Sequence, residues 1–243
     1  QVKDFAKAKR MLVSSSLGCS RREVSNEVFL VTGASGYIGS SLVSRLLKDN
    51  KKVIALIRAL DKEHLLNLRD FVNDKNLVII PTGNLVEFEG VKLLNSYIRK
   101  AHTVYHVAGR ASTRVNDLDA AIDMFSSNVL LTAVIARLVG RYHRKLIYAS
   151  SLHSYLSTQQ RPGVVKETTQ LPFSLSTKEW YEEFNNKIDE VASGYVNNEI
   201  ADTPYKIIRR LLNYDISSLE EFKKIIPEGL YGLSKIMAES FVK

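Results

Sequence analysis

The amino-acid sequence predicts an α/β fold, a doubly wound parallel sheet with helices on both faces. One observation is that short apolar runs alternate with longer amphipathic runs from Val28 to Ala149, as strands alternate with crossover helices. The other is that a glycine-rich turn joins the first apolar run to the first amphipathic run. Together they predict parallel strands that are each followed by a helix.

The expected strands are short runs rich in Val, Ile, Leu and aromatic residues. Pro81 ends the third, because proline cannot donate a hydrogen bond to a sheet ladder. With right-handed crossovers the strand order is 3-2-1-4-5, and a ligand lies at the carboxyl ends of the strands, where the order reverses. The five expected strands are Val28–Val31, Lys52–Ile57, Leu77–Ile80, Thr103–Val107 and Lys145–Ala149.

The amphipathic runs between these strands predict helices. In the second run, Leu65, Leu66, Leu68 and Phe71 supply a core face. The fourth run is the longest, and we expect it to form one continuous helix. The expected helices are Tyr37–Lys48, Asp61–Val72, Val91–Arg99 and Leu118–Val139.

The glycine-rich turn has the spacing of a site for a dinucleotide pyrophosphate. Gly33 permits the tight turn, Gly36 lets the backbone approach the phosphates, and Gly39 lets the helix pack on the strand. Free N–H groups and the helix dipole then hold the anion. The alternative is an ordinary turn before a helix. The segment reads Thr32, Gly33, Ala34, Ser35, Gly36, Tyr37, Ile38 and Gly39.

Length and composition suit a globular protein with one large domain: the chain has 243 residues, 45% hydrophobic and 25% charged. The single cysteine, Cys19, excludes an internal disulfide and a multi-cysteine metal site, and the five histidines have no metal-ligand spacing. We expect no membrane span, because no apolar run reaches about 18 residues. The longest candidate, Val129–Val139, fits a buried helix.

The net charge of +8 has two interpretations, a nucleic-acid partner or a solvated surface with a phosphate-rich cofactor site. The basic residues form no long run, so we expect no nucleic-acid partner. Residues 1–26 form a Ser-rich, basic extension without the apolar core of a secretory signal. We therefore expect a cytoplasmic protein, or an organellar one if the extension is the remnant of a targeting segment.

Tyr231 and Lys235 are four residues apart, so on a helix they share a face. A phenol with its ordinary pKa of about 10 is a poor acid-base group at neutral pH. A nearby ammonium lowers that pKa by stabilising the phenolate. Tyr231 is therefore the candidate that exchanges a proton with a substrate oxygen while a hydride moves to or from a nicotinamide.

The glycine turn, the segment Tyr231-Gly232-Leu233-Ser234-Lys235 and the pair Ser150-Ser151 after an apolar strand together resemble the short-chain dehydrogenase/reductase superfamily. They look like its extended branch, which includes NAD-dependent epimerases and dehydratases. The resemblance covers about Glu27 to Leu156 and resumes at Tyr231. It implies a Rossmann-like cofactor domain in which Lys235 also hydrogen-bonds the nicotinamide ribose.

The same resemblance implies roles for three further polar residues. Ser151 matches the family's catalytic Ser/Thr and would hydrogen-bond the substrate oxygen. Ser150 is the fallback, and both serines could instead cap the strand end. Asn128 matches an asparagine often found in the long fourth helix, where it would support the site, or else is simply a polar residue inside a helix.

Two loops resemble segments that lie along the cofactor. Val107, Ala108 and Gly109 follow the fourth strand, and Asn84 and Leu85 occupy the place of a family Asp-Leu pair whose carboxylate contacts adenine. An Asn carbonyl can accept the same hydrogen bond.

The end of the second strand decides the cofactor. NAD-dependent relatives place a carboxylate there, whereas this chain has Arg58, which can pair with a 2′-phosphate. Asp61, three residues further on, is the weaker candidate for a ribose contact. We therefore expect NADP(H) rather than NAD(H), with Arg58 as a solvated strand end the alternative.

Residues 173–227 form an insertion with no counterpart that we identify in the family. Capping signals at Ser176, Thr203-Pro204 and Ser217 predict three helices. Trp180, Phe184 and Ile188 recur at helical spacing and are expected to face inward. The insertion is then a helical decoration packed on the core, or alternatively a lid or docking surface.

The sequence thus predicts an NADP(H)-binding domain over residues 27–243 that acts on a small molecule. The first hypothesis is an oxidoreductase or epimerase of a secondary alcohol or ketone. The second is a non-catalytic subunit that binds NADP(H) within a larger assembly. Extended family members close their substrate pocket with a C-terminal domain, which we do not find before Lys243. We expect a homodimer partner or a completing polypeptide to supply that wall.

Overall fold

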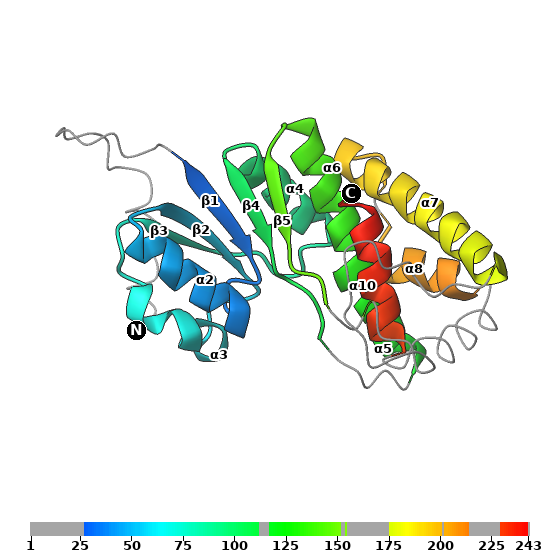
Figure 1. Cartoon of the computed structure of the whole chain (residues 1–243), viewed down its shortest axis with the longest axis horizontal. Coiled ribbons are helices and arrows are strands. Elements are labelled where there is room, and N and C mark those ends of the chain that lie inside the picture. The colour runs from blue at the N-terminus through cyan, green and yellow to red at the C-terminus, as the bar shows by residue number, and fades with distance from the viewer. Residues whose placement is uncertain are drawn as a thin grey trace, which may run out of the picture.

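The computed structural model describes residues 27–111, 117–151, 154, 175–200, 202–213 and 229–242. Its centre is a parallel sheet with the order β3-β2-β1-β4-β5, which confirms the predicted order (Figure 1). The register pairs Val31 with Ala55 and Thr32 with His106, so the ends of β1, β2 and β4 lie level. The strands are β1 (Val28–Thr32), β2 (Lys52–Ile57), β3 (Leu77–Pro81), β4 (Thr103–His106) and β5 (Lys145–Tyr148).

Each face of the sheet carries its own hydrophobic core, because successive strand residues point to opposite faces. Leu30, Ile54 and Leu56 belong to the larger core, which includes residues of α4 (Phe88–Ile98) and of the long central helix. Val31 and Ala55 belong to the smaller core under α2 (Tyr37–Lys48). The sheet is therefore covered on both faces, as the predicted fold requires.

The expected helix Asp61–Val72 is wrong in its geometry. Its place is taken by one α-helical turn, α3 (Lys62–Leu65), and then by a 3₁₀ segment, η1 (Leu66–Phe71). Only Leu68 of η1 is fully buried, whereas Leu66 is exposed. One buried side chain gives a regular amphipathic helix little to pack on, and most helical stability comes from such packing.

The long central helix is continuous but not uniform. It consists of α5 (Leu118–Phe125), a π-helical turn η2 (Ser126–Leu130) and α6 (Leu131–Arg141). Residues 118–141 are long and apolar enough to cross a membrane by length and composition alone. However, 78% of its most apolar window is buried inside the molecule, as in the core helix of a globular domain.

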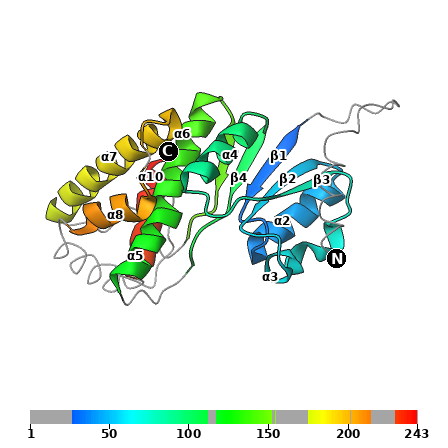
Figure 2. The ribbon, with the colours of Figure 1, turned by 180° about the vertical axis from the view of Figure 1, so that it is seen from behind.

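Two of the three helices expected in the insertion are present, α7 (Leu175–Asn197) and α8 (Pro204–Asn213). They pack against α6 and α5 on the side away from the sheet (Figure 2). Phe184 and Ile188 are buried, and the half-buried Trp180 stacks on Phe184 at 5.0 Å between ring centroids. The helix expected near Ser217 and the basic extension 1–26 lie outside the described residues.

Candidate functional site

A cavity of about 270 Å³ lies at the carboxyl ends of β1, β2, β3 and β4. Its walls are the glycine turn, the loops that follow β2, β3 and β4, and the start of α6. Strand order reverses at β1 and β4, so this is the position that the fold predicts for a ligand. The predicted cofactor residues that line it are Gly33, Ser35, Gly36, Arg58, Asn84, Leu85, Val107, Ala108 and Gly109.

The glycine turn has little room for side chains. Gly33 has a φ of 64°, and a Cβ on it would lie 2.7 Å from the Cα of Ala108. A Cβ on Gly39 would lie 2.2 Å from the carbonyl oxygen of Gly33. Gly36 lines the cavity and is the N-cap of α2, where no side chain of the described residues makes a capping bond. The first N–H groups of α2 are thus suited to an anion.

Tyr37, Ile38 and Gly39 do not line the cavity, although the sequence placed them with the cofactor. Tyr37 and Ile38 are exposed in the first turn of α2, and Gly39 is buried against the glycine turn. Thr32 is also absent from the lining, because its side chain is fully buried.

Thr32 begins a chain of buried hydrogen bonds that links β1, β4 and the central helix. Its Oγ1 accepts from the N–H of Ala108 at 3.2 Å and lies 2.8 Å from His106 Nδ1. His106 Nε2 lies 2.9 Å from Thr132 Oγ1, which donates to the carbonyl of Asn128 at 2.6 Å. Since a carbonyl only accepts, the Thr132 proton is committed and His106 Nε2 must be the donor to it.

His106 is therefore neutral and protonated on Nε2, and Thr32 donates to its Nδ1. Complete burial, assisted by the nearby Lys235, lowers the pKa of His106 to about 3. The sequence placed His106 within the fourth expected strand, Thr103–Val107, and gave it no role of its own. Bonds between residues this far apart in the chain have no local sequence signature.

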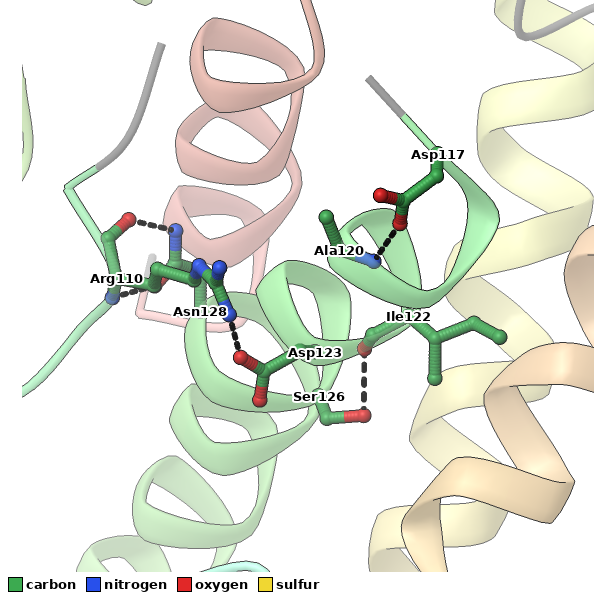
Figure 3. Close-up of polar contacts among 7 residues, drawn as sticks. All are labelled: Arg110, Asp117, Ala120, Ile122, Asp123, Ser126 and Asn128. Atoms are coloured by element: carbon green, nitrogen blue, oxygen red, sulfur yellow. Dashed lines mark hydrogen bonds and ion pairs between the residues drawn. The ribbon is translucent and has the colours of Figure 1, made fainter. Parts of the chain in front are cut away.

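Asn128 fastens the loop after β4 to α10 (Leu230–Ser240). Its Oδ1 accepts from the N–H of Arg110 at 2.7 Å, and its Nδ2 donates to the Arg110 carbonyl at 3.1 Å (Figure 3). The same Nδ2 donates to Ser234 Oγ at 2.9 Å. The Arg110 guanidinium pairs with Asp123 of α5. Asn128 thus supports the site from below the cavity wall and does not line it.

Lys235 is buried beneath the loop after β5. Its Nζ donates to the carbonyl of Ala149 at 3.1 Å and to Tyr148 Oη at 3.2 Å, and it lies 4.9 Å from the centre of the Tyr148 ring. Burial lowers the pKa of Lys235 to about 8, with Glu239 acting in the opposite direction. A Cβ on Gly109 would lie 3.5 Å from this Nζ, so the ammonium lies just behind that wall of the cavity.

Tyr231 and Ser151 stand on the two elements that meet at Lys235. Tyr231 is half-buried in the first turn of α10, and Ser151 is half-buried just after β5. Ser150 donates to Glu239 of α10. None of Ser151, Tyr231 and Lys235 lines the cavity, although the sequence grouped the last two with the cofactor.

The side of the cavity at the end of β2 is lined by Arg58 and by His64, a residue to which the sequence assigned no role. Asp61 is the N-cap of α3: its carboxylate accepts from the N–H of His64 at 2.8 Å and lies 2.8 and 2.9 Å from His64 Nδ1. These bonds, the backbone one first, lower the pKa of Asp61. Asp61 thus caps a helix and is absent from the lining.

Asn84 lines the cavity at the end of β3, where the resemblance places an adenine contact. Its Oδ1 also accepts from the N–H of Val86 at 3.4 Å, which orders the turn before α4. The charged residues of the described lining are Arg58 and Arg110, with no Asp or Glu among them. A cavity with this lining favours an anionic ligand.

A family profile described as the NAD dependent epimerase/dehydratase family matches residues 29–209. The chain is 29% identical over 207 residues to UDP-glucose 4-epimerase of Mycolicibacterium smegmatis, covering 84% of this chain and 56% of the relative. It is 26% identical over 164 residues to cinnamoyl-CoA reductase 1 of Petunia hybrida, covering 66% of this chain and 47% of the relative. The chain thus spans about half the length of these relatives.

Two solved structures share the fold. UDP-glucuronic acid 4-epimerase from Bacillus cereus, in complex with NAD, has a TM-score of 0.54 and 18% identity, covering 88% of this chain and 50% of that one. Yeast methylglyoxal/isovaleraldehyde reductase, complexed with NADPH, has a TM-score of 0.55 and 14% identity, covering 88% and 51%.

Proposed function

We propose, from the premise that the chain belongs to the NAD dependent epimerase/dehydratase family, that it binds NADP(H) as an oxidoreductase or epimerase of a secondary alcohol or ketone. The observation that carries the proposal is the cavity at the strand ends. The N-terminus of α2 opens beside it, and its charged lining within the described residues is cationic. Such a site suits a pyrophosphate and a further phosphate group.

Arg58 and Asp61 support NADP(H) over NAD(H). Arg58 lines the cavity at the end of β2, where its guanidinium suits a 2′-phosphate. Asp61, the acidic candidate for a ribose contact, is engaged by the N–H and the ring of His64. The relatives' names do not decide between cofactors, because one similar structure is described with NAD and the other with NADPH.

Binding by the whole chain tests this assignment. We expect fluorescence titration to give a Kd for NADPH at least tenfold lower than for NADH. Arg58→Ala should remove most of that difference, since one charge-assisted bidentate contact contributes about 1.5 to 3 kcal/mol. Arg69→Ala, at an exposed position on η1, is the matched control and should leave both constants unchanged. Equal or tighter NADH binding would contradict the NADP(H) assignment.

Residues of this chain would then transfer the proton to or from the substrate oxygen. A bound nicotinamide dinucleotide would supply or accept the hydride. Tyr231 would donate or accept the proton on the substrate oxygen, and Ser151 would hydrogen-bond the same oxygen. Lys235 lies one helical turn beyond Tyr231 on α10, so the two residues share a helix face, and burial lowers the pKa of Lys235 to about 8.

A non-catalytic NADP(H)-binding subunit is the second candidate, favoured by the absence of Ser151, Tyr231 and Lys235 from the described lining. Tyr231→Phe separates the two, because it removes only the hydroxyl. For an enzyme, turnover of a reactive ketone or nucleotide sugar should fall at least a thousandfold, while the Kd for NADPH stays within about twofold. Unchanged turnover would show that Tyr231 is not the acid-base group.

A further inference from the structure

Three consecutive polar residues of the π-helical turn η2 have three different surroundings. Ser126 is buried, and its hydroxyl donates to the carbonyl of Ile122 at 2.7 Å (Figure 3). Asn128 is also buried and holds the backbone of Arg110 through both of its amide atoms. Ser127, between them, is half-buried and lines the cavity. The turn therefore directs one of its three polar residues toward the cavity.

The hydroxyl of Ser127 has no hydrogen-bond partner among the residues that the structure describes. Ser126 satisfies its hydroxyl within the helix, whereas Ser127 keeps one donor and two acceptor positions for a ligand. A ligand group that pairs with this hydroxyl therefore breaks no bond to the described part of the protein. π-helical turns also occur frequently at functional sites.

Ser127 lies on the β4 side of the cavity, together with the loop that follows β4, whereas Arg58 lies at the end of β2. That loop packs closely on η2, since a Cβ on Gly109 would lie 2.9 Å from Asn128 Oδ1. Because β1 stands between β2 and β4, the two sides of the cavity are separated by the glycine turn. A dinucleotide with its pyrophosphate at that turn has its two halves on opposite sides of β1. With the 2′-phosphate at Arg58, the nicotinamide half lies on the side of Ser127.

The other described side chains on the β4 side offer a ligand little hydrogen bonding. Residues 107–109 and Leu131 have apolar side chains or none, and the guanidinium of Arg110 is paired with Asp123. Ser127 thus supplies a neutral donor and acceptor on this side. A neutral hydroxyl suits an uncharged partner, and the ribose hydroxyls and carboxamide of a nicotinamide riboside are groups of that kind.

We propose that Ser127 is a binding residue for the nicotinamide half of the cofactor, with its hydroxyl hydrogen-bonded to an uncharged group of the nicotinamide riboside. This inference rests on the proposed binding of NADP(H). Arg58 and Ser127 then bind the two ends of one dinucleotide, the first through charge and the second through a neutral hydrogen bond.

Isothermal titration calorimetry of the whole chain with two ligands isolates this contact. NADPH contains both halves, whereas adenosine 2′,5′-bisphosphate keeps the adenosine half with its 2′-phosphate and lacks the nicotinamide riboside. We expect Ser127→Ala to raise the Kd for NADPH about three- to tenfold, the contribution of one hydrogen bond between neutral groups. The Kd for adenosine 2′,5′-bisphosphate should stay within about twofold of wild type, because that ligand does not reach Ser127.

Ser126→Ala is the matched control, one residue away on the same turn. It removes the same hydroxyl group, but from a side chain that is satisfied within the helix and absent from the lining. Both Kd values should therefore follow wild type, and a general loosening of η2 would show itself in this variant too.

The outcomes separate the inference from the function on which it rests. An unchanged Kd for NADPH in Ser127→Ala, or an equal loss in Ser126→Ala, would overturn the role of Ser127. Equal weakening of both ligands by Ser127→Ala would also overturn it, because the effect would not belong to the nicotinamide half. Binding of neither ligand by the folded wild-type chain would instead refute the proposed NADP(H) binding.

Discussion

Lys235 shows at the residue scale how burial changes a side chain that a sequence pattern identifies. The spacing to Tyr231 predicted a shared helix face, and the resemblance implied a ribose contact. In the structure the ammonium is held by the Ala149 carbonyl and by the hydroxyl and ring of Tyr148. Burial lowers the pKa of Lys235 but raises that of Tyr148, so this hydroxyl stays protonated near neutral pH. Tyr148 thus positions the lysine without competing for its proton.

The lowered pKa of Lys235 predicts a pH-dependent stability. The native pKa is about 8 and the reference value is 10.5, so between these values the unfolded chain binds more protons than the native protein. Stability therefore rises with pH through this window and is constant below it. We expect the free energy of unfolding of wild type to rise by about 2 to 3 kcal/mol relative to Lys235→Met between pH 7 and 10.5.

Urea denaturation of both proteins at several pH values measures this difference. The comparison cancels the titration of groups that the two proteins share, such as Tyr148. A difference that stays constant, or that changes in the opposite direction, would show that Lys235 is not buried as described.

At the scale of elements, α7 and α8 of the insertion contribute to the larger core and are not an appendage. Phe184 of α7 is buried and meets Phe125 of α5, with 5.7 Å between ring centroids. Arg137 of α6 forms a two-point ion pair with Asp189 of α7 at 2.5 and 2.9 Å. These contacts favour the interpretation of α7 as a helical decoration over that of a mobile lid.

Truncation of Phe184 tests that packing. We expect Phe184→Ala to lower the free energy of unfolding by about 3 to 5 kcal/mol, because it leaves a cavity in the core. Glu182→Ala, at an exposed position on the same helix, should change it by less than about 0.5 kcal/mol. The measurement is urea denaturation followed by circular dichroism. Equal, small effects of both changes would place α7 outside the cooperative core.

The elements that the sequence predicted well are those with local signals. Strand order followed from the alternation and the handedness of crossovers, and α8 begins at Pro204 as its cap predicted. The hydrogen bonds from Thr32 through His106 to Thr132 could not be predicted. They join residues of β1, β4 and α6 that are far apart in the chain, so no local sequence pattern marks them. The link between Asp61 and His64 could have been, since an Asp three residues before its partner is an N-cap pattern.

At the scale of the whole molecule, the two cores cover the faces of the sheet, and the candidate site lies at the carboxyl ends of its strands. The glycine turn, the loops after β2, β3 and β4 and the π-helical turn all meet at the carboxyl ends of the strands. At the lateral edge of the sheet, β5 keeps Ile147 39% exposed. An exposed edge strand of this kind presents unpaired backbone groups to a further strand.

We propose that a nicotinamide dinucleotide binds at the carboxyl ends of the strands, with its pyrophosphate at the N-terminus of α2. Amide chemical shifts of the isotope-labelled chain, recorded during titration with NADPH, test it most directly. We expect the largest shifts on the N–H groups of Ser35, Gly36, Tyr37 and Ile38, with further shifts at Arg58 and Gly109. Saturating NADPH that leaves these amides unchanged, or shifts only residues elsewhere, would contradict it.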